Sequence, residues 1–380
     1  MATFEHRDLR LPSPRFDSPL IDAVVDLEHL RRRRLAHKAG DPVFAQLKSF
    51  FQAAKVLFSA RIEGNHSTMA EFLEKREEAA PDESTREILN LEAALRFVCE
   101  AVAAGEPLTQ AFVRELHKRV VSDLVREGDR TPGEYRNAEV RITNSPHVPP
   151  FPSDVPRYMA ELLDFVNAPN APKADLLKVA VAHHRFMWIH PFANGNGRVG
   201  RLFTYALLVK SGVIADGAER LIHPSAVFCS RRKEYYANLM AADTGSDEGL
   251  EAWCFFVLDG IRREAVRMAS LADSTDVFRK ILKPAFDDSL RRGDIDHIRH
   301  ALLLRGAQLG EFKVSDMESC LPGTTPRQRS HLFKQMRESR LLALTEEGAK
   351  THRINLFAPP LRRSLLRALI AEGLLGESES

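Results

Sequence analysis

The sequence predicts a mainly α-helical protein with one small β element in its first two thirds and a winged helix-turn-helix domain near its C-terminal end. Three observations lead to this fold class. Most of the chain repeats apolar residues at the three- and four-residue spacing of helices. One turn-rich stretch, residues 131–152, interrupts that pattern. After about residue 275 the segments become shorter and follow the order helix, helix, helix, hairpin.

The composition is that of a folded, soluble chain of two or three domains. The chain has 380 residues, of which 44% are hydrophobic and 28% charged, and it has no long uncharged apolar run. These values argue against bulk disorder and against a membrane span. A formal net charge of +2 does not by itself require a nucleic acid or an acidic membrane as partner. Four separated cysteines without a CxxC pair, and an N-terminus without the apolar core of a signal peptide, predict a cytoplasmic location.

The predicted helices begin close to the N-terminus. Residues 1–40 are expected to form an arm and a first helix. Residues 41–64 predict a long amphipathic helix that ends at Gly64. Further helices are expected over residues 67–79, 84–104, 109–125, 153–167 and 175–189, and another begins near Gly195 and closes at Gly212.

The turn-rich stretch TPGEYRNAEVRITNSPHVPPFP holds the β element. Val140 and Ile142 alternate with Arg141 between turn residues, which predicts a short strand or hairpin. This is the single β element expected before the C-terminal domain.

Residues 276–380 form the predicted C-terminal domain. The order of its segments is typical of a winged helix-turn-helix followed by a short amphipathic helix. Helices are expected over residues 298–304, 312–319 and 325–338, a hairpin over 341–344 and 354–357, and the last helix over 361–374.

The third helix of this domain carries a surplus of basic side chains, which suits contacts to nucleic-acid phosphates. Winged helices also serve as docking or dimerisation modules, and no aromatic or Asn/Gln series indicates base reading. DNA and a second copy of the chain therefore both stand as candidate partners. The basic residues are Arg327, Arg329, Lys334, Arg337 and Arg340.

A phosphate-binding pattern lies in the string HPFANGNGRVGR. Gly195 and Gly197 permit close backbone approach to an anion, and Asn196 supplies side-chain donors. The helix that follows directs free N–H groups and its positive dipole end at the same anion. Arg198 and Arg201 stand three residues apart, where their planar guanidinium groups can bind two phosphates of a nucleotide. No GxxxxGK[ST] string occurs, so the pattern is not a P-loop.

His190 opens this string, directly before Pro191. Its imidazole can take up a proton near neutral pH, so its place at the mouth of the phosphate site makes it the natural general base. A lone histidine beside a proline is more often structural, but the glycines and arginines that follow favour a catalytic role.

The string HPFANGNGRVGR resembles the signature of the Fic family, HPFx[D/E]GNGRxxR. The resemblance extends over about residues 40–265. It implies a helical core with a small β-hairpin flap, which we place in a domain of residues 41–275. Other strings typical of the family are HH-x-F at His183, His184 and Phe186, PGEYR at residues 132–136, the proline pair at 149–150 and EYY at 234–236.

This resemblance implies transfer of AMP from ATP to a Ser, Thr or Tyr hydroxyl of a target protein, or of the chain itself, with release of pyrophosphate. His190 would deprotonate that hydroxyl, and residues 195–197 would form the anion hole. Arg198 and Arg201 would orient the β- and γ-phosphates. The flap at Val140, Arg141, Ile142 and Thr143 would hold the target segment by strand-like pairing, while Tyr235 and Tyr236 match positions that line the adenine pocket.

Asn194 departs from the family pattern. The family usually has Asp or Glu there to hold Mg²⁺, and a neutral amide oxygen binds a hard cation more weakly than a carboxylate does. ATP could still carry Mg²⁺ with help from the Asn194 oxygen, or the departure could indicate slow transfer or a different phosphate substrate. We favour the first interpretation.

The string SARIEGN places a carboxylate where a helix opposes it. Glu63 lies in the last turn of the predicted helix, where the negative end of the dipole disfavours a carboxylate by about 0.3–1 kcal/mol. The string fits the inhibitory motif of the Fic family, [S/T]xxxE[G/N], with Ser59 and Glu63 at the expected places. The resemblance implies that Glu63 pairs with Arg201, so that ATP binds in an unproductive pose. The motif also admits the reverse reaction, in which Glu63 activates water to remove AMP.

Two functions remain for the chain. The first is an autoinhibited protein adenylyltransferase that uses ATP and acts without a membrane partner. The alternative is a DNA-binding regulator whose nucleotide site senses rather than transfers. Salt-dependent binding to duplex DNA without AMP transfer would favour the regulator, and labelled protein would favour the enzyme.

Overall fold

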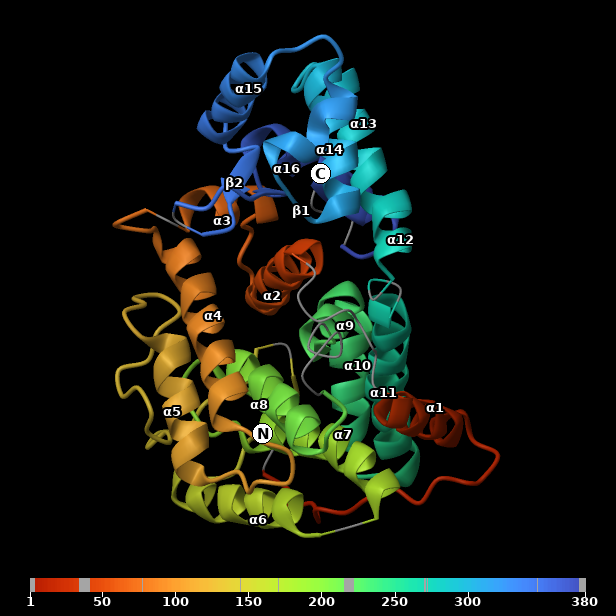
Figure 1. Cartoon of the computed structure of the whole chain (residues 1–380). Coiled ribbons are helices and arrows are strands. Elements are labelled where there is room, and N and C mark those ends of the chain that lie inside the picture. The colour runs from red at the N-terminus through yellow and green to blue at the C-terminus, as the bar shows by residue number, and fades with distance from the viewer. Residues whose placement is uncertain are drawn as a thin grey trace. The chain divides into compact units, whose positions relative to one another are not determined.

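Helices dominate the structure, a computed structural model, and its strands form one small sheet (Figure 1). The prediction of a mainly helical fold is therefore confirmed. No helix of the described chain is both long and apolar enough to cross a bilayer. The end of the predicted N-terminal segment, residues 34–40, lies outside the described chain. The structure describes residues 4–33, 42–76, 78–143, 145–169, 171–214, 222–269, 271, 273–346 and 348–375.

The chain divides into two compact units. The first contains Met1–Leu35 and Gln52–Val266, and the second contains Ala36–Phe51 and Arg267–Ser380. The division falls inside α2 (Pro42–Ile62), so the end of this helix belongs to the first unit.

Helices α7 and α8 pack against each other in the first unit, and α8 also packs against α4 and α5. The LFTYALL segment of α8, residues 202–208, is buried throughout. A helix that is apolar on nearly every side is stable only where other helices cover it, which explains this central place. The helices of the unit are α1 (Pro19–Arg33), the end of α2, α3 (Met69–Lys75), α4 (Glu83–Ala101), α5 (Gln110–Val121), α6 (Val155–Asn167), α7 (Pro172–Ile189), α8 (Asn196–Lys210), α9 (Pro224–Ser230), α10 (Arg232–Asp243) and α11 (Asp247–Ala269).

Two left-handed residues shape the connection between α7 and α8. His190 ends α7 with φ 51°, and Gly195 precedes α8 with φ 73°. Glycine adopts this conformation freely, whereas a residue with a Cβ does so at a cost in strain. The connection is therefore short and tight, and it brings the end of α7 next to the start of α8.

The strand predicted over residues 140–143 is absent. These residues form an irregular loop, in which the Ser145 amide donates to the Ile142 carbonyl oxygen at 3.3 Å. A strand needs a hydrogen-bonded neighbour, and the described chain pairs none with this segment. The predicted hairpin is thus wrong as secondary structure.

The second unit contains a three-stranded antiparallel sheet of order β1-β3-β2. The predicted hairpin corresponds to β2 and β3, but β1 has two residues and is too short to show an alternating pattern. The helix predicted over residues 312–319 is a 3-10 helix. The elements of the unit after α2 are α12 (Ser274–Val277), a π-helical turn (Phe278–Leu282), α13 (Lys283–Arg291), α14 (His297–Leu309), β1 (Glu311–Phe312), the 3-10 helix (Val314–Cys320), α15 (Pro326–Glu338), β2 (Leu342–Leu344), β3 (His352–Ile354) and α16 (Pro359–Ala371).

Candidate active site

A cavity of about 620 Å³ in the first unit collects most of the predicted site residues. Its walls are the start of α8, one face of α10, the end of α2 and the loop of residues 141–147. A volume of this size suits a nucleotide. Of the predicted residues, Ser59 and Val140 are not in its lining. Those in the lining are Glu63, Arg141, Ile142, Thr143, His190, Asn194, Gly195, Asn196, Gly197, Arg198, Arg201, Tyr235 and Tyr236.

The start of α8 is suited to an anion. No side chain caps this helix end, so its first N–H groups and its positive dipole end are directed at whatever lies above it. The Asn196 side chain is not one of these donors. Its Nδ2 donates to the Phe192 carbonyl oxygen at 2.8 Å, and its Oδ1 accepts from the Phe192 amide at 2.9 Å. Asn196 therefore braces the turn before α8, which corrects the prediction that its side chain binds the anion.

His190 presents a nitrogen that can accept a proton. Its Nδ1 lies 3.3 Å from the Met187 carbonyl oxygen. Because a carbonyl oxygen only accepts, Nδ1 carries the hydrogen and Nε2 keeps its lone pair. Burial lowers the pKa of His190 to about 4. The imidazole is therefore neutral at pH 7, which is the state that a general base requires.

Arg201 is held by the end of α2. Its Nη2 lies 2.8 Å from Glu63 Oε1, and its Nε donates to Ser59 Oγ at 2.9 Å. The Arg201 side chain is 1% exposed and that of Glu63 29%, so this charge-assisted contact is shielded from water. Burial raises the pKa of Glu63, but the charge and hydrogen bond of Arg201 outweigh it, and the pKa is lowered overall. At neutral pH the carboxylate is charged and neutralises the guanidinium, as the sequence predicted.

Gly197 permits this close approach. A Cβ on Gly197 would lie 2.0 Å from Glu63 Oε1 and 3.0 Å from Arg201 Nη1. No other residue would fit there without moving the carboxylate. The space above the first turn of α8, where an anion would lie, is therefore filled by a Glu63 oxygen.

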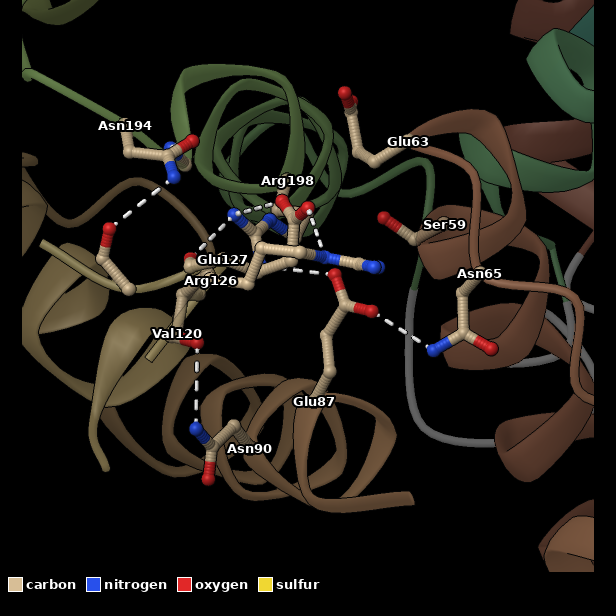
Figure 2. Close-up of polar contacts among 12 residues, drawn as sticks. Ser59, Glu63, Asn65, Glu87, Asn90, Val120, Arg126, Glu127, Asn194 and Arg198 are labelled. Carbon is tan, nitrogen blue, oxygen red and sulfur yellow. Dashed lines mark hydrogen bonds and ion pairs between the residues drawn. The ribbon is translucent and has the colours of Figure 1, made fainter. Parts of the chain in front are cut away.

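Arg198 is also bound to a carboxylate. Its Nη1 donates to Glu87 Oε1 at 2.8 Å and its Nη2 to the Glu127 main-chain oxygen at 2.8 Å (Figure 2). The Arg198 side chain is almost fully buried. Both guanidinium groups of the predicted phosphate site thus hold a carboxylate in this structure.

The two tyrosines have different places. The buried Tyr235 donates its hydroxyl hydrogen to His183 Nε2 at 2.9 Å, and His183 Nδ1 donates to Thr204 Oγ1 at 2.6 Å, since the Thr204 hydroxyl gives its own hydrogen to a main-chain oxygen. Burial lowers the pKa of His183 to about 3, so this histidine stays neutral. Tyr236 is 39% exposed. Tyr236 therefore offers the ring that an incoming base can contact, whereas Tyr235 supports the wall from behind.

Residues 107–208, which hold α5 to α8 and most of the cavity lining, match the Fic/DOC family. The chain contains a Fic domain. The protein adenylyltransferase Fic of Drosophila willistoni is 29% identical over 208 residues, which are 53% of this chain and 38% of that protein. The protein adenylyltransferase Fic of Nematostella vectensis is 28% identical over 253 residues, which are 63% of this chain and 54% of that protein. The chain thus spans about two fifths to half of the length of these relatives.

Solved structures show the same fold. A Fic family protein from Desulfovibrio desulfuricans G20 superposes with a TM-score of 0.56 and 18% identity, over 91% of this chain and 98% of that one. Fic-1 from C. elegans superposes with a TM-score of 0.51 and 21% identity, over 66% of this chain and 71% of that one. These likenesses support the Fic fold for the helical core.

Asn194 gives the Fic domain no carboxylate for a cation. Its Nδ2 donates to the Gly128 carbonyl oxygen at 3.1 Å, and its Oδ1 accepts from the Gly195 amide at 2.7 Å. Both polar atoms of the side chain are therefore in use. Within the described ranges no group of three His, Cys, Asp or Glu side chains could hold a metal ion. The residues present do not fit a protein-held Mg²⁺, and no step below passes through it.

Arg136 fixes the catalytic turn of the Fic domain, and sequence reasoning quoted it in PGEYR without giving it a role. The buried guanidinium donates from Nε to the His190 carbonyl oxygen at 2.8 Å and from Nη2 to the Pro150 carbonyl oxygen at 2.6 Å. These bonds join the base of the loop of residues 141–147 to the turn that carries the general base.

The far end of the cavity in the Fic domain is polar, which the sequence did not indicate. Asp243 accepts from His184 Nε2 at 2.9 Å, and His147 donates from Nε2 to the Trp188 carbonyl oxygen at 2.8 Å. Asp243 and His147 both line the cavity. Each comes from a segment without a motif, so only the fold brings them to the site.

Proposed function

We propose that the chain is a protein adenylyltransferase that transfers AMP from ATP to a hydroxyl of a target protein and is inhibited at rest by Glu63. The ion pair of Arg201 and Glu63 over the uncapped start of α8 carries the proposal. An anion site, a neutral base and a carboxylate that fills the anion site share one cavity. The relatives named protein adenylyltransferase favour the same reaction.

His190 acts first in this mechanism. Its Nε2 takes the proton of a Ser, Thr or Tyr hydroxyl, and the hydroxyl oxygen forms a bond to the α-phosphorus of ATP. The bond from the α-phosphorus to the bridging oxygen of the β-phosphate breaks, and pyrophosphate leaves. The N–H groups of residues 195–197 stabilise the charge on the α-phosphate, while Arg198 and Arg201 orient the β- and γ-phosphates.

Glu63 inhibits by competing for Arg201. While the carboxylate is in place, the γ-phosphate lacks its guanidinium partner, so the α-phosphorus is not in line with the attacking oxygen. The same carboxylate lies in the cavity where it can activate water, which gives the reverse reaction, removal of AMP from a modified hydroxyl.

The loop of residues 140–143 is the proposed docking site for the target segment. Arg141, Ile142 and Thr143 line the cavity, and the loop belongs to no strand of the described chain. An extended target can therefore add its main chain to this loop and present its hydroxyl to His190. Another copy of the chain, or a segment of the same copy, is a possible target by the same chemistry.

The test uses ATP labelled in parallel at the α- and γ-phosphates. The parent chain, Glu63→Gly and His190→Ala are each incubated with Mg²⁺ and labelled ATP, alone and with a cell lysate. We expect only the α-label on protein, with more in Glu63→Gly than in the parent and none in His190→Ala. Transfer of the γ-label would show phosphorylation instead, and no transfer by Glu63→Gly would contradict the proposal.

The second candidate function is a DNA-binding regulator with a nucleotide-sensing Fic site. It is favoured by α15, on which Arg327, Lys334 and Arg340 are exposed, and by the order of helices and strands around it, which we interpret as a winged helix. Arg329, however, is paired with Glu318, which reduces the free positive charge. Binding to duplex DNA that weakens steeply with salt, in the absence of AMP transfer, would establish this function.

A further inference from the structure

The end of α2 is fixed by a Schellman turn that places Glu63. The Asn65 amide donates to the Ala60 carbonyl oxygen and the Gly64 amide to the Arg61 carbonyl oxygen, both at 3.1 Å. Gly64 supplies the left-handed residue of the turn, with φ 102°. Glu63 is thus the last residue before the chain reverses, and its carboxylate can stay on its partner only while this turn stays in place.

Asn65 ties the turn to α4. Its Nδ2 donates to Glu87 Oε2 at 2.8 Å and to the Ser84 carbonyl oxygen at 3.0 Å, and its Oδ1 accepts from the Ser67 amide at 3.0 Å. Asn65 is 7% exposed. A buried amide whose donors and acceptor are all used holds its segment in one position.

Glu87 joins this contact to the phosphate site. One oxygen of its carboxylate accepts from Asn65 and the other accepts from Arg198 Nη1 (Figure 2). Glu87 is 3% exposed. Burial raises the pKa of Glu87, and the Arg198 charge and the Asn65 hydrogen bond oppose that rise. A carboxylate so buried is stable only with both partners in place, so loss of either one disturbs the other.

We infer that Asn65 and Glu87 form a latch that joins the end of α2 to Arg198 and thereby holds Glu63 on Arg201. Asn65 and Glu87 are positioning residues, since they act on the nucleotide site through Glu63 and Arg198. Release of inhibition then requires the bond between Asn65 and Glu87 to break. The inference rests on the proposed function and extends it to regulation of the same site.

Asn90 provides a matched control. It lies on α4, and its Nδ2 donates to the Val120 carbonyl oxygen at 3.4 Å and to the Ser122 carbonyl oxygen at 2.6 Å. Asn90→Ala therefore removes the same amide group and a similar pair of bonds as Asn65→Ala. It does so on the side of α4 that contacts α5, away from the end of α2 (Figure 2).

The activity test places Asn65→Ala and Asn90→Ala in the parent chain and in Glu63→Gly, and measures transfer of α-label. We expect Asn65→Ala to raise the parent rate at least fivefold and to leave the Glu63→Gly rate unchanged, because the latch acts only through Glu63. Asn90→Ala should change neither rate. An equal effect of Asn65→Ala in both backgrounds, or no rise in the parent, would overturn the latch. Asn65→Ser, which is too short to reach Glu87, repeats the test if the alanine variant folds poorly.

A second measurement does not depend on catalysis. Amide hydrogen exchange of the nucleotide-free chain is compared between the parent, Asn65→Ala and Asn90→Ala. Asn65→Ala should speed exchange at residues 59–66 at least fivefold and leave residues 202–208 of α8 unchanged, whereas Asn90→Ala should not affect residues 59–66. Unchanged exchange at residues 59–66 would overturn the latch. If Glu63→Gly transfers no AMP while the exchange result is as expected, the proposed reaction fails and the latch stands.

Discussion

Lowering the pH from 8 to 5 is expected to leave AMP transfer by Glu63→Gly almost unchanged. The reason is the burial of His190, which lowers its pKa to about 4. Burial disfavours the charged imidazolium, so the proton binds only at a lower pH. At pH 5 about 90% of a histidine with this pKa is neutral, against about 3% of one with the ordinary value of 6.5. The two cases thus differ about thirtyfold in the amount of active base.

The assay is the initial rate of α-label transfer at ATP concentrations well below KM, because kcat/KM reports the protonation of the free enzyme. Far-UV circular dichroism at each pH confirms that the chain stays folded, and His190→Ala gives the background rate. A rate that halves near pH 6.5 and then falls about tenfold per pH unit would refute the reasoning. It would show that the imidazole is as open to water as in a peptide.

Three further predictions concern the inhibitory contact and the cation. Glu63→Gly should raise the basal rate of AMP transfer about ten- to a hundredfold, because a charge-assisted hydrogen bond such as that to Arg201 contributes about 1.5–3 kcal/mol; a change below about twofold in the α-label assay would contradict this. Ser59→Ala should lower the free energy of unfolding by about 1.5–3 kcal/mol, because Arg201 Nε loses its acceptor in a buried place. Urea denaturation measures this, and a loss under about 0.5 kcal/mol would argue that another group replaces the hydroxyl. Asn194→Asp should lower the Mg²⁺ concentration for half-maximal transfer several-fold, since a carboxylate binds a hard cation more strongly than an amide; an unchanged titration curve would argue that residue 194 lies away from the cation.

The site could be predicted where its residues are close in the sequence. His190, Gly197 and Arg201 stand within one string, so a tight turn followed by a helix is enough to bring them together. The partner of Arg201 could also be predicted, because Glu63 belongs to a motif of its own. The same reasoning gave the wrong role to Asn196, because a free amide and an amide that braces a turn look alike in a sequence.

Contacts between distant segments could not be predicted. Glu87 is 111 residues from Arg198, and nothing in the sequence around it distinguishes a buried carboxylate from an exposed one on a helix. Arg136 and Asp243 reach the site only through the packing of α7 and α10. The hairpin predicted at residues 140–143 failed for the opposite reason, since a local alternation cannot form a strand without a partner.

The missing Cβ of Gly197 has a genetic consequence. The space above it holds a Glu63 oxygen in the resting chain, and in the proposed reaction the same space receives a phosphate oxygen. Any side chain at this position that expels the carboxylate also expels the substrate. A random mutation at the start of α8 therefore cannot produce an unregulated enzyme, and variants that escape control while remaining active must arise among residues 59–65 or in the groups that hold them.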